Sequence, residues 1–241
     1  MARRVLLKLS GEALMGSGQF GIDPEALSAY AAQIATAQSQ GVEVGVVVGG
    51  GNIFRGVSGP AAGMDRATAD TMGMMATVMN ALALTDALKS QGARATSFCS
   101  LEMPRVMALF THRDARAALA RGEICVFAGG TGSPFFTTDT GAALKAAELG
   151  ADEVLKGTQV DGVYEADPLQ DPSARRFEQL SLTECLARDL KVMDSAAFSL
   201  CLSSSLSIRV FKLDSEEALL QALLGAPLGT LVGPGLEARF S

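Results

Sequence analysis

The sequence lacks both the residues of a conventional zinc site and the positive charge of a nucleic-acid-binding protein. Its 241 residues include one histidine, His112, and four cysteines with no CxxC pair, which excludes zinc ligation of the usual Cys/His kind. Lysine and arginine number 20 against 26 acidic residues, whereas DNA or RNA binding rests on a broad cationic surface. We therefore expect no nucleic-acid partner and no protein-bound metal, and we expect the cysteines to be buried thiols of a cytoplasmic protein.

Long apolar runs are missing as well. Lys8 interrupts the apolar stretch at the N-terminus, which is too short for the core of a signal peptide. No segment approaches the ~18 uninterrupted apolar residues of a membrane span, so we expect no membrane association. Charged residues make up only 19% of the chain and hydrophobic residues 48%. This balance excludes disorder and predicts a folded protein.

Short β-branched runs alternate with longer helical patterns, which is typical of parallel βαβ units. We expect strands at 5–9, 42–48, 94–98, 124–128, 153–155 and 208–211. We expect helices at 24–40, 66–91, 114–121, 139–149, 181–190, 194–205 and 215–224. No linker or repeat divides the chain, so the sequence predicts one α/β domain over residues 1–241, a mainly parallel sheet covered by helices on both faces. Residues 158–180 are expected to form a long loop.

The predicted helix at 66–91 has an unusual composition. It contains no charged residue between Thr71 and Thr85, and its methionines point in several directions: Met72, Met74, Met75 and Met79. A helix that is apolar all round has to be buried on all sides. It lies either inside a thick core or against another subunit, and we favour the subunit interface.

Three glycine-rich loops follow predicted strands, at residues 8–11, 49–52 and 129–134. Ligands bind at the carboxyl ends of strands in an open parallel sheet, and backbone N–H groups in such loops can hold an anion. The Walker A pattern and the catalytic-loop motifs of protein kinases are both absent. Residues 16–21 match GxGxxG, but they do not follow a clean strand, so a dinucleotide site is disfavoured.

Few charged residues lie near these loops. Lys8 ends an apolar strand, where an unpaired ammonium is costly; it either extends to solvent at the sheet edge or binds a transferring phosphoryl group. Arg55 is either a surface charge or a bidentate phosphate ligand. Simpler interpretations exist for Asp70, as an exposed acid, and for Asp139, as a helix N-cap.

Six motifs, in order along essentially the whole chain, resemble those of the bacterial uridylate kinase family within the amino acid kinase superfamily. They are KLSGEAL (8–14), GGGNIFRG (49–56), MGM (72–74), GTGSPFFTTD (130–139), VDGVY (160–164) with DP (167–168), and KVMD (191–194). The third and fourth distinguish this family from acetylglutamate kinases, aspartokinases and carbamate kinases. The chain departs from the family pattern at three positions. Thr71 stands where His is usual, Ser133 where Asn is usual, and Gln159 where Lys is usual.

The resemblance implies an αβα sandwich in a homohexamer that transfers the γ-phosphoryl group of ATP, with Mg²⁺, to UMP, with GTP as activator and UTP as inhibitor. The residues it implies for ATP are Lys8, Leu9, Ser10, Gly11, Gly51, Arg55, Thr158, Tyr164 and Asp167. Those for UMP are Gly50, Asp70 on the ribose hydroxyls, Thr131, Gly132, Ser133, Pro134, Phe135, Phe136, Thr137 and Thr138. The GTP-responsive region would include Gly16, Ser17, Gly18, Gln19, Phe20 and Gly21.

Phosphoryl transfer needs in-line positioning and positive charge more than it needs a strong base. We therefore expect Lys8 and Lys156, held apart by Asp139, to flank the transferred group, and Asp194 to steady Lys8 or the metal. Two alternatives stay open. One is a sister kinase with a carboxylate or carbamate acceptor, and the other is a non-catalytic member of the fold that binds nucleotides or oxoanions.

Overall fold

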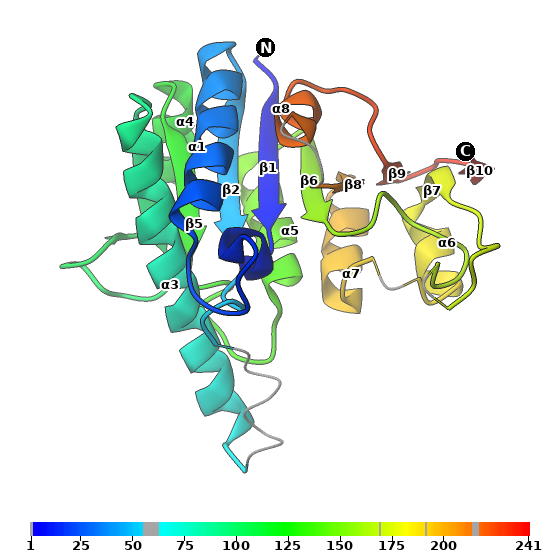
Figure 1. The fold of residues 1–241 in the computed structure, drawn as a ribbon, viewed down its shortest axis with the longest axis horizontal. Coiled ribbons are helices and arrows are strands. Elements are labelled where there is room, and N and C mark those ends of the chain that lie inside the picture. Colours follow the sequence, from blue (N-terminus) through cyan, green and yellow to red (C-terminus); the bar gives the residue numbers. More distant parts are fainter. Residues whose placement is uncertain (1, 55–62, 169, 191, 214–216) are drawn as a thin grey trace.

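A computed structural model describes residues 2–54, 63–168, 170–190, 192–213 and 217–241 (Figure 1). The expected strands are all present, as β1 (Arg4–Leu9), β2 (Glu43–Val48), β3 (Ala95–Cys99), β5 (Ile124–Ala128), β6 (Glu153–Thr158) and β8 (Ser207–Lys212). The expected helices follow as α1 (Pro24–Ser39), α3 (Arg66–Ser90), α4 (His112–Ala120), α5 (Thr138–Leu149), α6 (Leu182–Ala187), α7 (Ser195–Ser203) and α8 (Ala218–Leu223).

Several short elements were not predicted. They are the 3₁₀ helix η1 (Gly11–Met15) and the strands β4 (Ala108–Leu109), β7 (Phe177–Ser181), β9 (Thr230–Gly233) and β10 (Arg239–Phe240). The expectation of a loop over 158–180 is therefore partly wrong. Strand β6 continues to Thr158, β7 begins at Phe177, and an antiparallel bridge pairs Tyr164 with Arg176 between them.

The strands join one sheet in the order β10-β7-β9-β8-β6-β1-β2-β5-β3-β4. Among the described strands, β8 with β9 and β7 with β10 pair antiparallel, and the other pairs are parallel. The sheet is thus mainly parallel, as predicted. The neighbours β6, β1, β2 and β5 bring their carboxyl ends to the same edge.

Alternate side chains of β1 enter two different hydrophobic cores. Leu7 and Leu9 pack with buried residues of α1, α3 and α8. Leu6 packs on the opposite face, with buried residues of α4, α5, α6 and α7. Helices therefore cover both faces of the sheet (Figure 1), and the predicted three-layer αβα sandwich is confirmed.

Helix α3 is not buried on all sides. Asp65 caps its N-terminus by accepting a hydrogen bond from the Thr68 N–H at 3.0 Å, and the N-terminal turns project beyond the carboxyl ends of the strands (Figure 1). One face packs into the core, but four large apolar side chains on the other are 40–55% exposed: Met72, Met75, Met79 and Leu82. Burial within a thick core of this chain is therefore wrong, and the expectation of a subunit interface stands.

The cysteines lie in the interior, as expected. Cys99, Cys125, Cys185 and Cys201 are buried and form no disulfide. Burial raises the pKa of the Cys125, Cys185 and Cys201 thiols to about 12, which keeps them protonated at neutral pH. Of the helices in the described ranges, none is long and apolar enough to cross a bilayer.

Candidate active site

The three glycine loops meet at the carboxyl ends of the neighbouring strands β1, β2 and β5. The first and second loops touch closely. A Cβ on Gly11 would collide with Asn52 Oδ1 and would lie 2.8 Å from the Gly51 nitrogen, so glycine is needed at this position. In the first loop the Leu9 side chain is fully buried, and Ser10 caps η1 by accepting a hydrogen bond from the Ala13 N–H.

Lys8 and Lys156 are paired residues of the neighbouring strands β1 and β6. The carboxylate of Asp139, in the first turn of α5, lies between them. Lys8 Nζ is 3.0 Å from Oδ1 and Lys156 Nζ is 2.7 Å from Oδ2, so the arrangement predicted from the sequence is present. All three side chains are 13–15% exposed. Two ammonium groups thus share one carboxylate at the sheet edge.

Burial lowers the pKa of Lys156, and the neighbouring Lys8 charge acts in the same direction, while Asp139 opposes both. Lys156 Nζ also donates to the carbonyl oxygen of Val192. Asp139 Oδ1 accepts no hydrogen bond among the described residues, although the Lys8 ammonium lies beside it. A desolvated cation next to a carboxylate is the kind of pair that marks a functional site.

Asp194 lies beside the start of α5 and acts on Lys156 through its charge. Its carboxylate accepts hydrogen bonds from the hydroxyls of Thr137 and Thr140, the latter at 2.8 and 2.9 Å, and from the Ala197 N–H at 2.9 Å. Burial alone would raise the pKa of Asp194, but these hydrogen bonds hold it below its usual range. In the described part of the chain no ion pair joins Asp194 to Lys8. Asp194 instead fixes the start of α5, which carries Asp139.

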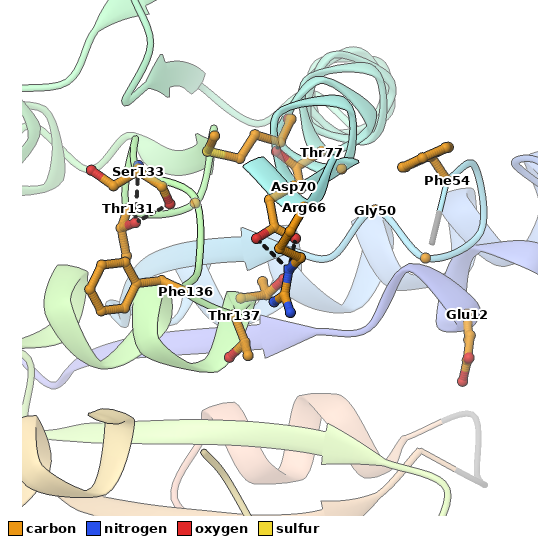
Figure 2. Close-up of a pocket in the computed structure, with 15 residues that line it drawn as sticks. Glu12, Gly50, Phe54, Arg66, Asp70, Thr77, Thr131, Ser133, Phe136 and Thr137 are labelled. Carbon is orange, nitrogen blue, oxygen red and sulfur yellow. Dashed lines mark hydrogen bonds and ion pairs between the residues drawn. The ribbon is translucent and has the colours of Figure 1, made fainter. Parts of the chain in front are cut away.

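A cavity of about 480 Å³ lies beside the third loop (Figure 2). It brings together eight of the predicted substrate and phosphate residues: Gly50, Gly51, Asp70, Thr131, Ser133, Phe136, Thr137 and Thr138. Gly51, expected on ATP, lies in the same cavity as the residues expected on UMP. Gly132, Pro134 and Phe135 are not among its lining residues, but the Phe135 N–H donates to Asp70 Oδ2 at 2.8 Å.

A second cavity of about 590 Å³ shares no lining residue with the first. Its lining includes Lys156 itself and the residues expected to hold the nucleoside of ATP, which are Thr158, Tyr164 and Asp167. The Tyr164 hydroxyl donates to Asp161 at 2.7 Å. The charge cluster therefore borders the second cavity through Lys156, and Asp139 directly follows Thr138, which lines the first cavity. Arg55, the remaining predicted phosphate ligand, lies outside the described residues.

The GxGxxG segment is not a dinucleotide loop. Residues 16–21 follow η1 instead of a strand, as the sequence indicated, and Phe20 is 74% exposed. The segment is tied to the second glycine loop, because the Gly21 N–H donates to the Asn52 carbonyl and Asn52 Nδ2 donates back to the Gly21 carbonyl, both at 2.8 Å.

Two site features were missed at the sequence level. Arg66 lines the first cavity and binds Asp70 (Figure 2). Buried polar residues of α3 also hold the glycine loops, since Thr77 Oγ1 accepts from the Gly129 N–H at 2.8 Å and Asn80 donates to the Gly49 carbonyl at 2.7 Å. For Thr77 and Asn80, the signal that could have revealed this role was a polar residue within the uncharged span 71–85 of α3.

A mainly parallel sheet with three glycine loops at the carboxyl ends of its strands, and with a lysine–carboxylate cluster beside a cavity, has the features that a phosphotransferase of the α/β class needs. The chain belongs to the amino acid kinase family, whose members it matches over residues 3–212. It is therefore a phosphoryl-transferring kinase. In the described residues, no three His, Cys, Asp or Glu side chains are grouped to hold a metal ion.

Solved structures of similar proteins cover almost the whole chain. A UMP kinase from Bacillus anthracis is 33% identical, with a TM-score of 0.95 over 100% of this chain and 99% of that one. A UMP kinase from Ureaplasma parvum is 34% identical, with a TM-score of 0.91 over 97% and 99%. A uridylate kinase from Archaeoglobus fulgidus is 29% identical, with a TM-score of 0.73 over 96% and 100%.

Proposed function

We propose that this kinase transfers the γ-phosphoryl group of ATP to UMP, giving ADP and UDP in pyrimidine nucleotide synthesis in the cytoplasm. The observation that carries the proposal is the cluster of Lys8, Asp139 and Lys156, in a site with two cavities of nucleotide size, one of them lined by Lys156. UMP as the acceptor is supported by the similarity to UMP kinases over the full chain.

The larger cavity takes the nucleoside of ATP, against Thr158, Tyr164 and Asp167. The triphosphate then extends toward Lys8 and the first two loops. Because Leu9 is buried, it contributes its backbone rather than its side chain. The smaller cavity takes UMP, with Asp70 accepting hydrogen bonds from the ribose hydroxyls and the third loop enclosing the base and phosphate.

An oxygen of the UMP phosphate attacks the γ-phosphorus of ATP, and the bond from that phosphorus to the β,γ-bridging oxygen breaks, leaving ADP. The attacking atom is already an anionic oxygen, so a strong general base is unnecessary. Lys8 and Lys156 neutralise the charge on the transferred group, and Asp139 keeps the two ammonium groups apart and oriented. Mg²⁺ enters as part of the Mg-ATP substrate, bound to its phosphates.

Assembly and regulation complete the proposal. The exposed apolar face of α3 joins subunits into a homohexamer, for which its methionines provide the apolar area. GTP activates through residues 16–21, whose hydrogen bonds to Asn52 connect them to the second glycine loop. UTP, which shares the base and ribose of UMP, inhibits.

The experiment is a steady-state assay of ADP release with UMP, CMP, carbamate and N-acetylglutamate as acceptors, each with and without GTP and UTP. We expect UMP to give the highest kcat/KM, with activation by GTP and inhibition by UTP. Preference for carbamate or N-acetylglutamate would identify a sister kinase. Nucleotide binding without ADP release would identify a non-catalytic member of the fold.

A further inference from the structure

Arg66 and Asp70 form an ion pair on the wall of the smaller cavity (Figure 2). Arg66 Nε donates to both carboxylate oxygens of Asp70, at 2.9 Å to Oδ1 and 2.8 Å to Oδ2. The Asp70 side chain is only 12% exposed, against 44% for Arg66. The carboxylate is thus largely covered, with the guanidinium on its solvent side.

Helix stability does not explain this arrangement. Arg66 is the first residue of α3, where the positive end of the helix dipole disfavours a cation. A basic residue four positions before an acidic one is also the weaker order for a helical ion pair, and partly exposed pairs add little to stability. The position of Arg66 is better explained by what it does to Asp70.

The third loop holds Asp70 from the other side. The Phe135 N–H donates to Asp70 Oδ2 at 2.8 Å, and the Phe135 ring lies 5.8 Å from the Arg66 guanidinium carbon. Phe135 has a φ of 72°, a left-handed conformation that costs energy in a residue with a side chain and that is concentrated at functional sites. Arg66 and Phe135 therefore fix the carboxylate between them.

The carboxylate keeps some capacity to bind a ligand. A carboxylate has about four acceptor positions, and the hydrogen bonds from Arg66 and Phe135 involve Oδ2 twice and Oδ1 once. Asp70 Oδ1 thus has room for a further donor. Without a compensating cation, however, the charge of Asp70 would repel a phosphate dianion bound in the same partly dehydrated cavity.

We propose that Arg66 is a positioning and specificity-determining residue for the acceptor nucleotide, which orients Asp70 toward the ribose hydroxyls and cancels its charge. The inference rests on the proposed function, in which Asp70 binds the ribose of UMP. It predicts that Arg66 affects recognition of the acceptor and leaves recognition of ATP unchanged.

The test is steady-state kinetics of Arg66→Gln with UMP, dUMP and ATP as the varied substrates. The KM for UMP should rise about tenfold, the scale of one charge-assisted hydrogen bond, while kcat and the KM for ATP stay within about twofold of the unsubstituted values. The KM for dUMP should rise less, because dUMP lacks a ribose hydroxyl. Arg66→Lys should have a KM for UMP between those of the unsubstituted enzyme and Arg66→Gln, since lysine keeps the charge but lacks the Nε donor.

Two further measurements separate positioning from a general structural effect. In an Asp70→Asn background, Arg66→Gln should change the KM for UMP by less than about twofold, because residues acting through one contact are not additive. Arg121→Gln is the matched control: its Nε lies 2.8 Å from Glu123 Oε1, and its side chain is 58% exposed. Arg121→Gln should match the unsubstituted enzyme in both kinetics and thermal stability.

The outcomes are distinguishable from failure of the proposed function. No turnover of UMP by the unsubstituted enzyme would overturn the proposed function and this inference with it. In an enzyme that does turn over UMP, an equal rise in both KM values, or full additivity with Asp70→Asn, would overturn the inference alone.

Discussion

The side-chain amides of Asn52 and Asn80 form a reciprocal hydrogen-bonded pair in the protein interior. Asn52 Nδ2 donates to Asn80 Oδ1 at 3.0 Å, and Asn80 Nδ2 donates to Asn52 Oδ1 at 2.7 Å. Both residues are at most 1% exposed. Because Asn80 also binds the Gly49 carbonyl and Asn52 packs against Gly11, the pair connects α3 to two of the glycine loops.

Asn80→Leu should lower both stability and kcat/KM for ATP. It leaves the buried Asn52 amide short of partners, at a cost of about 1–3 kcal/mol in the free energy of unfolding. Replacing both residues, Asn52→Leu with Asn80→Leu, should recover part of the lost stability but no activity, because the Gly49 and Gly21 carbonyls still lose their donors; thermal unfolding and steady-state kinetics would show both effects. Thr85→Val is the control, because Thr85 is buried in the same helix and, among the described residues, its hydroxyl bonds only the Ala81 carbonyl. Full activity in the double variant would refute a positioning role for the pair.

Lys8→Ala should lower kcat by ~10²–10³, the usual effect of removing one preorganised charge from a transition state. Lys89→Ala is the control, since Lys89 is an exposed residue in the last turn of α3. The measurement is ADP release at saturating UMP and ATP, with circular dichroism to confirm folding. A folded Lys8→Ala enzyme with near-normal kcat would contradict the role of the cluster.

The activity should depend on pH through Lys156. Its charged form is needed, and burial lowers its pKa, so it loses its proton at a lower pH than an ordinary lysine, whose pKa is about 10.4. The pH dependence of kcat/KM for ATP reports the titration of groups in the free enzyme. We expect kcat/KM to decline as the pH rises, and the decline should begin at a lower pH than the titration of an ordinary lysine would give. Lys156→Arg should move the decline to higher pH, because arginine stays protonated. An identical profile in the two enzymes would show that another group titrates.

The apolar face of α3 should control assembly. Met79, 55% exposed, lies on the same face as Met75 and Leu82, so Met79→Glu would place a charge in the proposed interface. We expect sedimentation velocity to show hexamers for the unsubstituted chain and smaller species with a lower melting temperature for Met79→Glu. Leu224→Glu, at an exposed site just after α8, should leave assembly intact. An unsubstituted chain that is a stable monomer would contradict the interface.

The sequence was sufficient to predict the parts of the fold that have strong local patterns. The bounds of strand β5, Ile124–Ala128, match the prediction, because an unbroken run of five apolar residues is typical of a strand buried on both faces. The cluster of Lys8, Asp139 and Lys156 was expected from the motifs that resemble those of the uridylate kinase family, and the two lysines do lie side by side on β1 and β6. The short strands β9 and β10 were missed, because pairing with distant strands, and not local propensity, determines them.

Side-chain partners were harder to predict than elements. Asp194 was expected to steady Lys8 or the metal, and its hydrogen bonds to Thr137 and Thr140, where α7 packs against α5, were not foreseen. Arg66 was overlooked because a basic residue four positions before an acid on a helix is typical of a surface pair. The exposure of Met79 also depends on the sheet beneath α3, which covers only one side of the helix.

The most direct test of the central claim is transfer of label from [γ-³²P]ATP to UMP. We predict that label appears in UDP in a one-to-one ratio with the ADP formed, and that Lys8→Ala slows this transfer by the same factor as it slows ADP release. ADP release that leaves UDP unlabelled, with the label in inorganic phosphate or in a carboxylate or carbamate acceptor, would contradict this prediction.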